Sequence, residues 1–225
     1  MASADRVNLT YLITGLQYGG ANIGMVRLLS GLDPEEYDIT VIAVVKTSDD
    51  VVDLLPDHVT VHRLNISEVT ESYRVLKLVP LLRGTDVLVC SLFHASVVGV
   101  PLARLLGVPK VLVWQHNTEF RNDRRRTIYR QLHEAAHHIL ADSNAVSRML
   151  SDCLEIPSSK VTQLPIAGVD TGRFSPQDFE ESQDDSITVG TIARLVEQKG
   201  LFELLHCAEI LGNEYQFEII GQGEQ

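Results

Sequence analysis

Residues 7–24 read VNLTYLITGLQYGGANIG, a short apolar run followed directly by a glycine-rich stretch. Val7–Thr14 has the β-branched and apolar residues of a buried strand, and Ala21–Leu32 has the periodicity of a helix. Four glycines lie among the ten residues 15–24. Such a turn between a strand and a helix often holds a phosphate, because glycine lets backbone amides approach an anion at the helix N-terminus. The loop is therefore either an anion site or a tight strand-to-helix turn, and its sequence alone leaves both open.

Two established phosphate-binding patterns do not fit this loop. A dinucleotide-binding fingerprint requires G-x-G-x-x-G and an acidic residue about 20 residues later. Here the glycine spacing differs, and the next expected strand ends in Val44, Val45 and Lys46. A P-loop requires G-x-x-x-x-G-K-[ST], but Ala21 and Met25 stand where the lysine would follow. These departures weigh against an oxidoreductase and against a site for a triphosphate with its magnesium.

Short apolar runs alternate with helix-length amphipathic stretches along the chain, which predicts a parallel sheet with crossover helices. Runs such as VIAVV and DVLVC suit strands that are covered on both faces. The predicted fold is α/β, a Rossmann-like parallel sheet with helices on both faces. The expected strands are Leu9–Ile13, Ile39–Val45, Val59–Leu64, Asp86–Cys90, Val111–Gln115, Ile139–Asp142 and Val161–Leu164. The expected helices are Ala21–Leu32, Glu71–Leu82, Ser96–Leu106, Arg121–Glu134 and Asn144–Leu154.

The alternation breaks at residues 175–186, SPQDFEESQDDS, which are polar, acidic and nearly free of large apolar side chains. This composition is typical of a linker. We therefore predict a first domain over residues 1–174, an acidic linker over 175–186 and the start of a second α/β domain over 187–225. The last part is shorter than the roughly 50 residues of an independent domain, so we expect the first part of a two-domain protein. Its expected elements are strands at Ser186–Ala193 and Tyr215–Ile220 and a helix at Gln198–Leu211.

The composition limits which binding partners and which cellular compartment are expected. A formal net charge of −11 over 225 residues repels a polyanion, so no nucleic acid is expected, although the basic segment Arg121–Arg130 can meet a phosphate or an anionic lipid. The three cysteines have neither metal-ligand spacing nor an even count, which fits a reducing compartment. The N-terminus lacks a signal-peptide pattern, and prolines and charges interrupt the most apolar region, Ser91–Trp114. These features predict a cytoplasmic protein. His133 and His137 are one helical turn apart, but no metal site is expected there.

A second candidate site is GTIARLVEQKG, residues 190–200, between an expected strand and an expected helix. Gly190 is expected to end the strand. Arg194 and Lys199 are expected on either side of the helix start, where amide dipoles add to their charge. Two cations beside a helix N-terminus suit a diphosphate. The alternative is that both are ordinary surface charges, as most arginines and lysines are.

A third candidate is WQHNTEFRNDRRR, residues 114–126. Trp114–Asn117 is expected at the carboxyl end of a strand, where open parallel sheets bind ligands. His116 can donate a hydrogen bond to a sugar hydroxyl there, or it can be a structural or merely exposed histidine. The arginines that follow are interpreted as a solvated helix face, with an anionic acceptor or a lipid headgroup as the second interpretation.

Several segments occur in a fixed order along the chain: GLQYGGANIGMVRLLSGL, VWQHN, ADSNAVSRML with LPIAGVDTGRFSP, and GTIARLVEQKGLFELLHCAEIL with FEIIGQGEQ. In this order they resemble the family-4-type retaining glycosyltransferases, which have two facing Rossmann-like domains, the GT-B architecture. The resemblance covers most of the chain. It implies that residues 1–174 are the N-terminal, acceptor-side domain and that residues 187–225 are the incomplete start of the nucleotide-sugar-binding domain.

The resemblance implies an enzyme that moves a sugar from a nucleotide diphosphate-sugar to a saccharide or lipid-linked acceptor with retention of configuration, in polysaccharide or glycoconjugate biosynthesis. Arg194 and Lys199 would hold the donor diphosphate and stabilise the charge that grows on the leaving group. Gly19 and Gly20 would approach the donor phosphate or sugar, and His116 would contact the sugar near the reacting carbon. The expected catalytic residues are His116, Arg194 and Lys199, and the expected donor-binding residues are Gly19, Gly20, Asn117, Gly190, Arg194 and Lys199.

No metal and no cofactor is expected beside the donor substrate, because the cations and backbone amides would do that work. A lipid-linked acceptor would bring peripheral contact with a membrane on its cytoplasmic face. Two departures from the family pattern stand out. The family usually has P-N-G-V-D where residues 165–170 read PIAGVD, and its pair of glutamates in the second domain has no counterpart before Gln225. The fragment alone is therefore expected to be inactive.

Two other functions remain open at this stage. A nucleotide-sugar epimerase on the same architecture would use similar sites but would need acid–base groups near the sugar. A non-catalytic nucleotide-sugar-binding or partner subunit is the second alternative. The missing asparagine in PIAGVD favours that alternative mildly, whereas the presence of Arg194 and Lys199 weighs against it.

Overall fold

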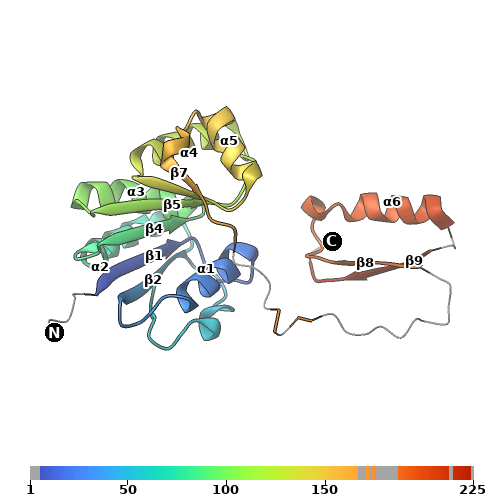
Figure 1. Cartoon of the computed structure of the whole chain (residues 1–225), viewed down its shortest axis with the longest axis horizontal. Helices are drawn as coiled ribbons and strands as arrows, with labels where there is room; N and C mark the ends of the chain where they lie inside the picture. Colours follow the sequence, from blue (N-terminus) through green and yellow to red (C-terminus); the bar gives the residue numbers. More distant parts are fainter. Residues whose placement is uncertain (1–5, 167–170, 173, 176–186, 213–214, 224–225) are drawn as a thin grey trace. The chain divides into compact units, whose positions relative to one another are not determined.

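The computed structural model describes residues 6–166, 171–172, 174–175, 187–212 and 215–223. The chain divides into two units, Met1–Val169 and Asp170–Gln225 (Figure 1). The predicted linker over residues 175–186 lies outside the described residues except for Ser175, so it stays a prediction.

A seven-stranded sheet forms the centre of the first unit, in the order β3-β2-β1-β4-β5-β6-β7. Every neighbouring pair is parallel, so each connection must cross over a face of the sheet. This is the Rossmann-like α/β fold that the sequence pattern predicts, and the seven predicted strands agree with it to within two residues at each end. The strands are β1 (Val7–Ile13), β2 (Tyr37–Val45), β3 (Thr60–Ile66), β4 (Val87–Ser91), β5 (Lys110–Gln115), β6 (His138–Ala141) and β7 (Val161–Gln163).

Helices cover both faces because successive strand residues point to opposite sides. In β1, Leu12 packs in one core with α3 (Phe93–Leu106), whereas Tyr11 and Ile13 pack in another with α1 (Gly20–Ser30). Burying each such side chain stabilises the fold by about 1.5–3 kcal/mol. The Leu12 core also contains residues of α2 (Leu78–Leu82) and α4 (Asp123–Ala135), and α5 (Asn144–Leu154) forms a third core with β6.

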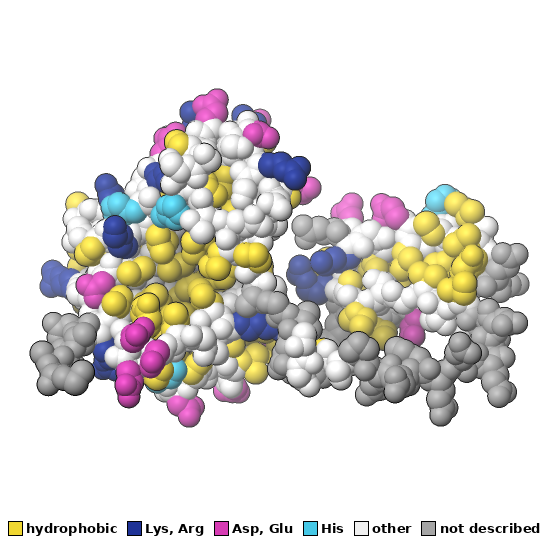
Figure 2. Space-filling model, in the orientation of Figure 1, with side chains coloured by type: hydrophobic (Ala, Val, Ile, Leu, Met, Phe, Trp, Pro, Cys, Tyr) yellow, Lys and Arg dark blue, Asp and Glu magenta, His cyan; other side chains and the backbone are white. Residues whose placement is uncertain are grey.

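The α1 side of the sheet is the less covered one. By strand register, Leu9, Val87, Leu112 and Leu140 share this face, and all four are only half-buried. Figure 2 shows hydrophobic side chains gathered on one face of this unit, over the region of β1, β4 and β5 in Figure 1. Parallel sheets are usually covered on both faces, so the described residues leave part of a strand face open here.

Two predicted helices of the first unit differ from the structure, and for Ser96–Leu106 the difference is that α3 begins three residues earlier, at Phe93. Glu71–Leu82 is expected as a single α-helix, but a 3₁₀ segment, η2 (Val69–Lys77), precedes the single turn α2. The start of this segment is rich in β-branched and hydroxyl residues, which are weak helix formers. The Glu71 carboxylate also accepts the Ser67 N–H at 2.7 Å, which favours the tight local turn.

The second unit consists of two parallel strands, β8 (Ile187–Ile192) and β9 (Tyr215–Ile220), joined through α6 (Leu201–Leu211). The predicted helix begins three residues too early, because Gly200 at φ 65° separates the short 3₁₀ turn η4 (Glu197–Lys199) from α6. None of the described residues of this unit is buried. In neither unit do the described residues include a helix with the length and apolar character needed to cross a bilayer.

Gly99 lets α3 approach the sheet closely. A Cβ at this position would lie 2.4 Å from Leu12 Cδ2 and 2.7 Å from Cys90 Sγ. We therefore expect Gly99→Ala to lower the free energy of unfolding by about 1–3 kcal/mol, measured by urea denaturation. Gly31→Ala is the matched control, because Gly31 has φ −88° and its added Cβ would come no closer than 3.5 Å to another atom. Equal losses in both variants would contradict this packing.

Candidate functional site

The order of the sheet reverses between β1 and β4, which marks the place where open α/β sheets bind ligands. The connection after β1 runs through α1 on one face, and the connection after β4 runs through α3 on the other. Diverging connections leave a crevice at the carboxyl ends of the strands. The segments that follow β1, β4, β5 and β6 all begin at this edge.

The first half of the glycine-rich loop is tied to the segment after β2. The Leu16 N–H donates to Thr47 Oγ1 at 2.9 Å, and the Tyr18 N–H donates to Asp50 Oδ2 at 3.1 Å. Gly15 is needed for this approach, since an added Cβ would lie 2.5 Å from Thr47 Cγ2. The Tyr18 N–H is thus already bonded to the Asp50 carboxylate and is not available to an anionic ligand.

The second half of the loop is open. Gly19 and Gly20 are exposed, and an added Cβ on either would meet nothing within 4 Å. α1 begins here with no side-chain cap and no acidic residue in its first turn, so the described residues give the N–H groups of that turn no capping side chain. Gly24, by contrast, lies close to Ile166, because an added Cβ would be 3.0 Å from Ile166 Cγ2. Gly15 and Gly24 therefore serve packing, whereas Gly19 and Gly20 leave room for a ligand at the helix N-terminus.

His116 follows β5 and lies between side chains from the two neighbouring strands. Its Nε2 is 2.9 Å from Ser91 Oγ at the end of β4, and its Nδ1 is 3.5 Å from Asp142 Oδ2 just after β6. Only 6% of the His116 side chain is exposed. Ser91 is completely buried, so it can orient the imidazole but cannot itself reach a substrate.

The surroundings keep His116 uncharged at neutral pH. Burial lowers its pKa from the usual value of about 6.5, and the negative charge of Asp142 only partly offsets this effect. A carboxylate facing Nδ1 favours the tautomer with the proton on that nitrogen. Nε2 then accepts the hydrogen bond from the Ser91 hydroxyl. The histidine therefore contributes a polar but neutral group to this edge.

Buried polar atoms without a hydrogen-bond partner occur on the strands next to His116. Among the described residues they include Tyr11 Oη and Thr14 Oγ1 on or after β1, and Trp114 Nε1 on β5. The Trp114 ring is 5.1 Å from the His116 ring and 6.4 Å from the Tyr11 ring, measured between centroids. Unpaired buried polar groups are costly and are typical of sites that meet water or a ligand.

Asn117, the residue directly after His116, is exposed. Its carbonyl accepts a hydrogen bond from the buried Gln115 amide at 2.7 Å, which fixes the turn directly after β5. Gly19, Gly20, His116 and Asn117 thus all lie on segments at one edge of the sheet. Ser91 and Asp142 were not predicted as site residues; their only signal is that each is a polar residue at or directly after the end of a buried strand.

The second unit carries the remaining predicted residues. The expectation that Gly190 ends its strand is wrong, because β8 continues to Ile192 and Gly190 pairs with Glu218 of β9. Arg194 and Lys199 both precede α6, rather than lying on either side of its start. Both side chains are exposed, and neither forms an ion pair within the described residues.

The segment of Arg194 is held by glycines that follow β9. The Leu195 N–H donates to the Gln222 carbonyl at 2.8 Å. A Cβ added to Gly221 would lie 1.8 Å from the Ala193 carbonyl oxygen, and a Cβ added to Gly223 would lie 2.1 Å from the Leu195 carbonyl oxygen. These two glycines, which were not singled out from the sequence, therefore position the Arg194 segment.

Residues 133–137 read HEAAH, which matches the zinc motif H-E-x-x-H by its letters, a match that the sequence-based expectation of no metal overlooked. α4 ends at Ala135, so the two histidines do not share a helix face. His133 is fully buried with its Nδ1 2.5 Å from the Tyr129 carbonyl, and burial lowers its pKa to about 4. The His137 Nδ1 accepts the Val111 N–H, and Glu134 pairs with Arg130. The described residues contain no group of three such side chains that could hold a metal ion.

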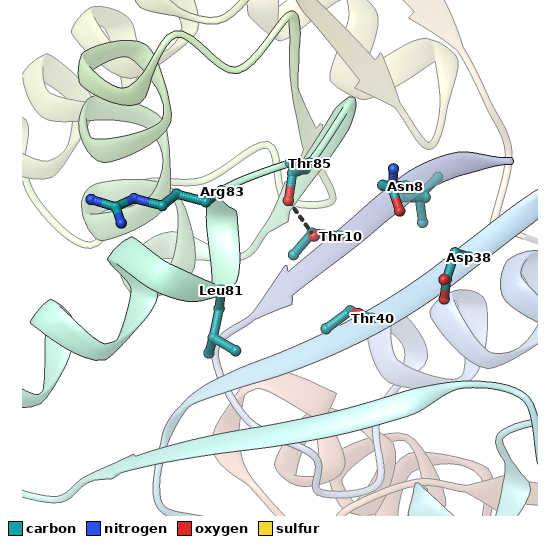
Figure 3. A pocket seen from close by; sticks show the side chains of 9 residues that line it. Asn8, Thr10, Asp38, Thr40, Leu81, Arg83 and Thr85 are labelled. Carbon is teal, nitrogen blue, oxygen red and sulfur yellow. Dashed lines mark hydrogen bonds between the residues drawn. The ribbon is translucent and has the colours of Figure 1, made fainter. Parts of the chain in front are cut away.

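A cavity of about 170 Å³ lies at the opposite, amino-terminal edge of β1 and β2. Figure 3 shows that Thr10 and Thr85 hydrogen-bond to each other across it, at 2.8 Å, and that the Arg83 side chain points away from the two strands. Asn8 is likewise bonded to Asp86. Because Asn8, Thr10 and Thr85 hydrogen-bond within the protein, these three side chains are not free to hold a ligand in this cavity.

The model of Glycosyltransferase Family 4 matches residues 18–173, more than half of the chain. The chain belongs to glycosyltransferase family 4. This confirms the resemblance seen in the sequence motifs, and Gly19, Gly20, His116 and α4 all lie within the matched residues. No curated protein sequence matches this family 4 chain.

Solved structures share its fold at low sequence identity. Anabaena Alr3699/HepE, in complex with UDP and glucose, has a TM-score of 0.75 and 16% identity, over 96% of this chain and 61% of that one. A glycosyltransferase from Rickettsia africae has a TM-score of 0.69 and 15% identity, over 98% and 61% of the two chains. A putative UDP-N-acetylglucosamine 2-epimerase from Listeria monocytogenes has a TM-score of 0.61 and 13% identity, over 96% and 63%. The chain thus spans about three fifths of each of these proteins.

The contact between Asp142 and His116 can be tested by NMR titration of the histidine rings. We expect His116 to titrate below about 6.5 and to titrate lower still in Asp142→Asn, because that change removes the charge that raises its pKa. Since the folded state resists protonation of His116, this group lowers stability as the pH falls below about 6.5. Asp57→Asn, an exposed carboxylate before β3, should leave the His116 titration unchanged. A higher His116 pKa in Asp142→Asn would contradict the geometry.

Proposed function

We propose that this chain is part of a retaining glycosyltransferase. The enzyme would move a sugar from a nucleotide diphosphate-sugar to a saccharide or lipid-linked acceptor, in polysaccharide or glycoconjugate biosynthesis. The observation that carries the proposal is the family 4 match over residues 18–173. The UDP and glucose bound by the similar Anabaena protein support a nucleotide-sugar donor. The free cysteines, with Cys153 and Cys207 exposed, support action in the cytoplasm.

In the first unit, we assign the sugar end of the donor to the carboxyl edge of the sheet. The open amides at Gly19 and Gly20 are donors for a phosphate or sugar oxygen. Asn117, exposed on the turn held by Gln115, is a further donor or acceptor for sugar hydroxyls. His116 is assigned to the sugar near the reacting carbon, held by Ser91 and Asp142 as a neutral ring that adds no repulsion toward positive charge developing there.

In the second unit, we assign the diphosphate to Arg194 and Lys199. During transfer, the bond from the anomeric carbon to the phosphate oxygen breaks and its electron pair stays on that oxygen. The acceptor hydroxyl oxygen forms the new bond to the anomeric carbon, and its proton passes to the departing phosphate oxygen. Two exposed cations just before α6 stabilise the charge on the departing diphosphate. Gly190 in β8 is assigned as an open backbone position beside the donor. On this account neither a metal nor a cofactor is required.

The test is release of nucleoside diphosphate from UDP-glucose and related donors by the full-length protein in the presence of a saccharide acceptor. We expect Arg194→Ala with Lys199→Ala to lower kcat by about 10²-fold or more, because each removes charge stabilisation in the transition state. Lys77→Ala with Arg83→Ala, a pair of exposed cations near α2, is the matched control and should retain the wild-type rate. A chelator should not slow the reaction. An unchanged rate without Arg194 and Lys199 would refute the diphosphate assignment.

A nucleotide-sugar epimerase is the second candidate, and the fold similarity to the Listeria protein favours keeping it. Incubating the donor without an acceptor separates the two, because an epimerase would convert it into a new sugar nucleotide. A non-catalytic binding subunit would give neither product. Its motivating sequence feature, PIAGVD, lies outside the described residues from Ala167 to Asp170.

A further inference from the structure

Positive charge is concentrated in one short segment of an acidic protein. Residues 119–130 contain five of the 19 lysines and arginines of the chain but only two acidic residues, while the whole chain carries −11. Four of these arginines, Arg121, Arg124, Arg125 and Arg126, lie just before or in the first turns of α4 and are called the arginine cluster here.

The described residues do not neutralise this cluster with ion pairs. Arg130, one turn further along, forms ion pairs with Glu134 and Glu155. Arg121, Arg124 and Arg126 are exposed and form no ion pair with any described residue. Their positions also work against the helix, because positive charge at a helix start opposes the dipole and Asp123 is the acidic residue in that turn. A locally unfavourable arrangement of this kind is typical of a functional surface.

The arginine cluster stands at the same edge of the sheet as His116. The Arg125 guanidinium lies 4.4 Å above the ring of Phe93, the first residue of α3. Phe93 is two residues after Ser91, which contacts His116 at 2.9 Å. Tyr129 packs against Phe93 and Phe120 with ring centroids 5.2 Å and 5.4 Å apart. These packed aromatic rings therefore hold Arg125 in place. The other arginines of the cluster belong to the same segment and lie beside the candidate site.

The surroundings favour a discrete anion over a membrane surface. Helices that insert into an interface carry large apolar side chains beside their basic residues. Among the described residues of α4 and of the loop before it, 116–135, no large hydrophobic side chain is exposed, and the exposed Leu105 lies at the end of α3 away from Phe93. Several guanidinium groups on one short segment suit phosphate, which offers up to two charges and several acceptor oxygens, better than a single carboxylate.

We propose that the arginine cluster binds a phosphate group carried by the acceptor, so that the acceptor is a phosphate-bearing saccharide or a lipid-phosphate-linked one. This inference rests on the proposed glycosyl transfer and names the acceptor class for that site. Arg124 and Arg126 supply exposed guanidinium groups, Arg121 adds charge from the preceding loop, and Arg125 keeps the segment on Phe93. The phosphate would anchor the acceptor next to the edge where Gly19, Gly20 and His116 lie.

The test uses inorganic pyrophosphate as the probe and calorimetry as the readout. The 225-residue chain carries Arg194→Ala and Lys199→Ala throughout, which removes the cations of the second unit. We expect saturable binding that weakens at least tenfold on adding Arg124→Ala and Arg126→Ala, and less on adding Arg124→Lys and Arg126→Lys. Adding Lys77→Ala and Arg83→Ala instead should leave binding unchanged. Absence of saturable binding, or equal loss in this control, overturns the proposal.

Two further arms identify the source of the phosphate. Glucose 6-phosphate that displaces pyrophosphate while glucose does not supports a soluble phosphorylated acceptor. Co-sedimentation with phosphatidylglycerol–phosphatidylcholine vesicles that pyrophosphate competes away supports a lipid-borne phosphate. Vesicle binding that pyrophosphate does not affect indicates a diffuse membrane surface and overturns the proposal. Neither arm needs donor turnover, so pyrophosphate binding without sugar transfer would count against the proposed function and not against the phosphate site.

Discussion

The parallel pairing of β1 with β4 is the constraint on which the candidate site depends. The pairing runs in register from Leu9 beside Val87 to Ile13 beside Ser91, and Ser91 in turn lies beside Trp114 of β5. This register places the Ser91 hydroxyl within hydrogen-bond distance of His116, two residues beyond Trp114. Because the connections after β1 and β4 leave toward opposite faces, the same pairing opens the edge at which these side chains meet.

The electrostatics of the two units follow a common pattern. An overall charge of −11 repels anionic ligands from most of the surface, so any exposed positive segment gains selectivity for them. The arginine cluster in the first unit and the Arg194–Lys199 segment in the second are two such segments. His116 differs from both, because burial keeps it neutral and it acts through hydrogen bonds rather than through charge.

Much of the fold could be predicted from sequence because its signals are local. Each buried strand is a short apolar run, and Asn144–Leu154 is a helix with Ser143 as its cap, so its bounds were predicted correctly. The contacts of His116 with Ser91 and Asp142 could not be predicted, since they depend on strand register and join residues more than twenty positions apart in the sequence. The four glycines of the opening loop look alike in sequence, and only their neighbours separate packing at Gly15 from open space at Gly19. The assigned roles of His116, Arg194 and Lys199 stay predictions.

The central proposal is that the carboxyl edge of the first sheet, and not the cavity at its amino edge, meets the sugar end of the donor. Hydrogen–deuterium exchange of the full-length protein with and without UDP-glucose tests this most directly. The account predicts slower exchange in residues 16–23, 91–95 and 115–118, with no change in residues 8–10, 38–40 and 81–85. Protection at the amino edge, with none in the loop of Gly19 and Gly20 or around His116, would contradict it.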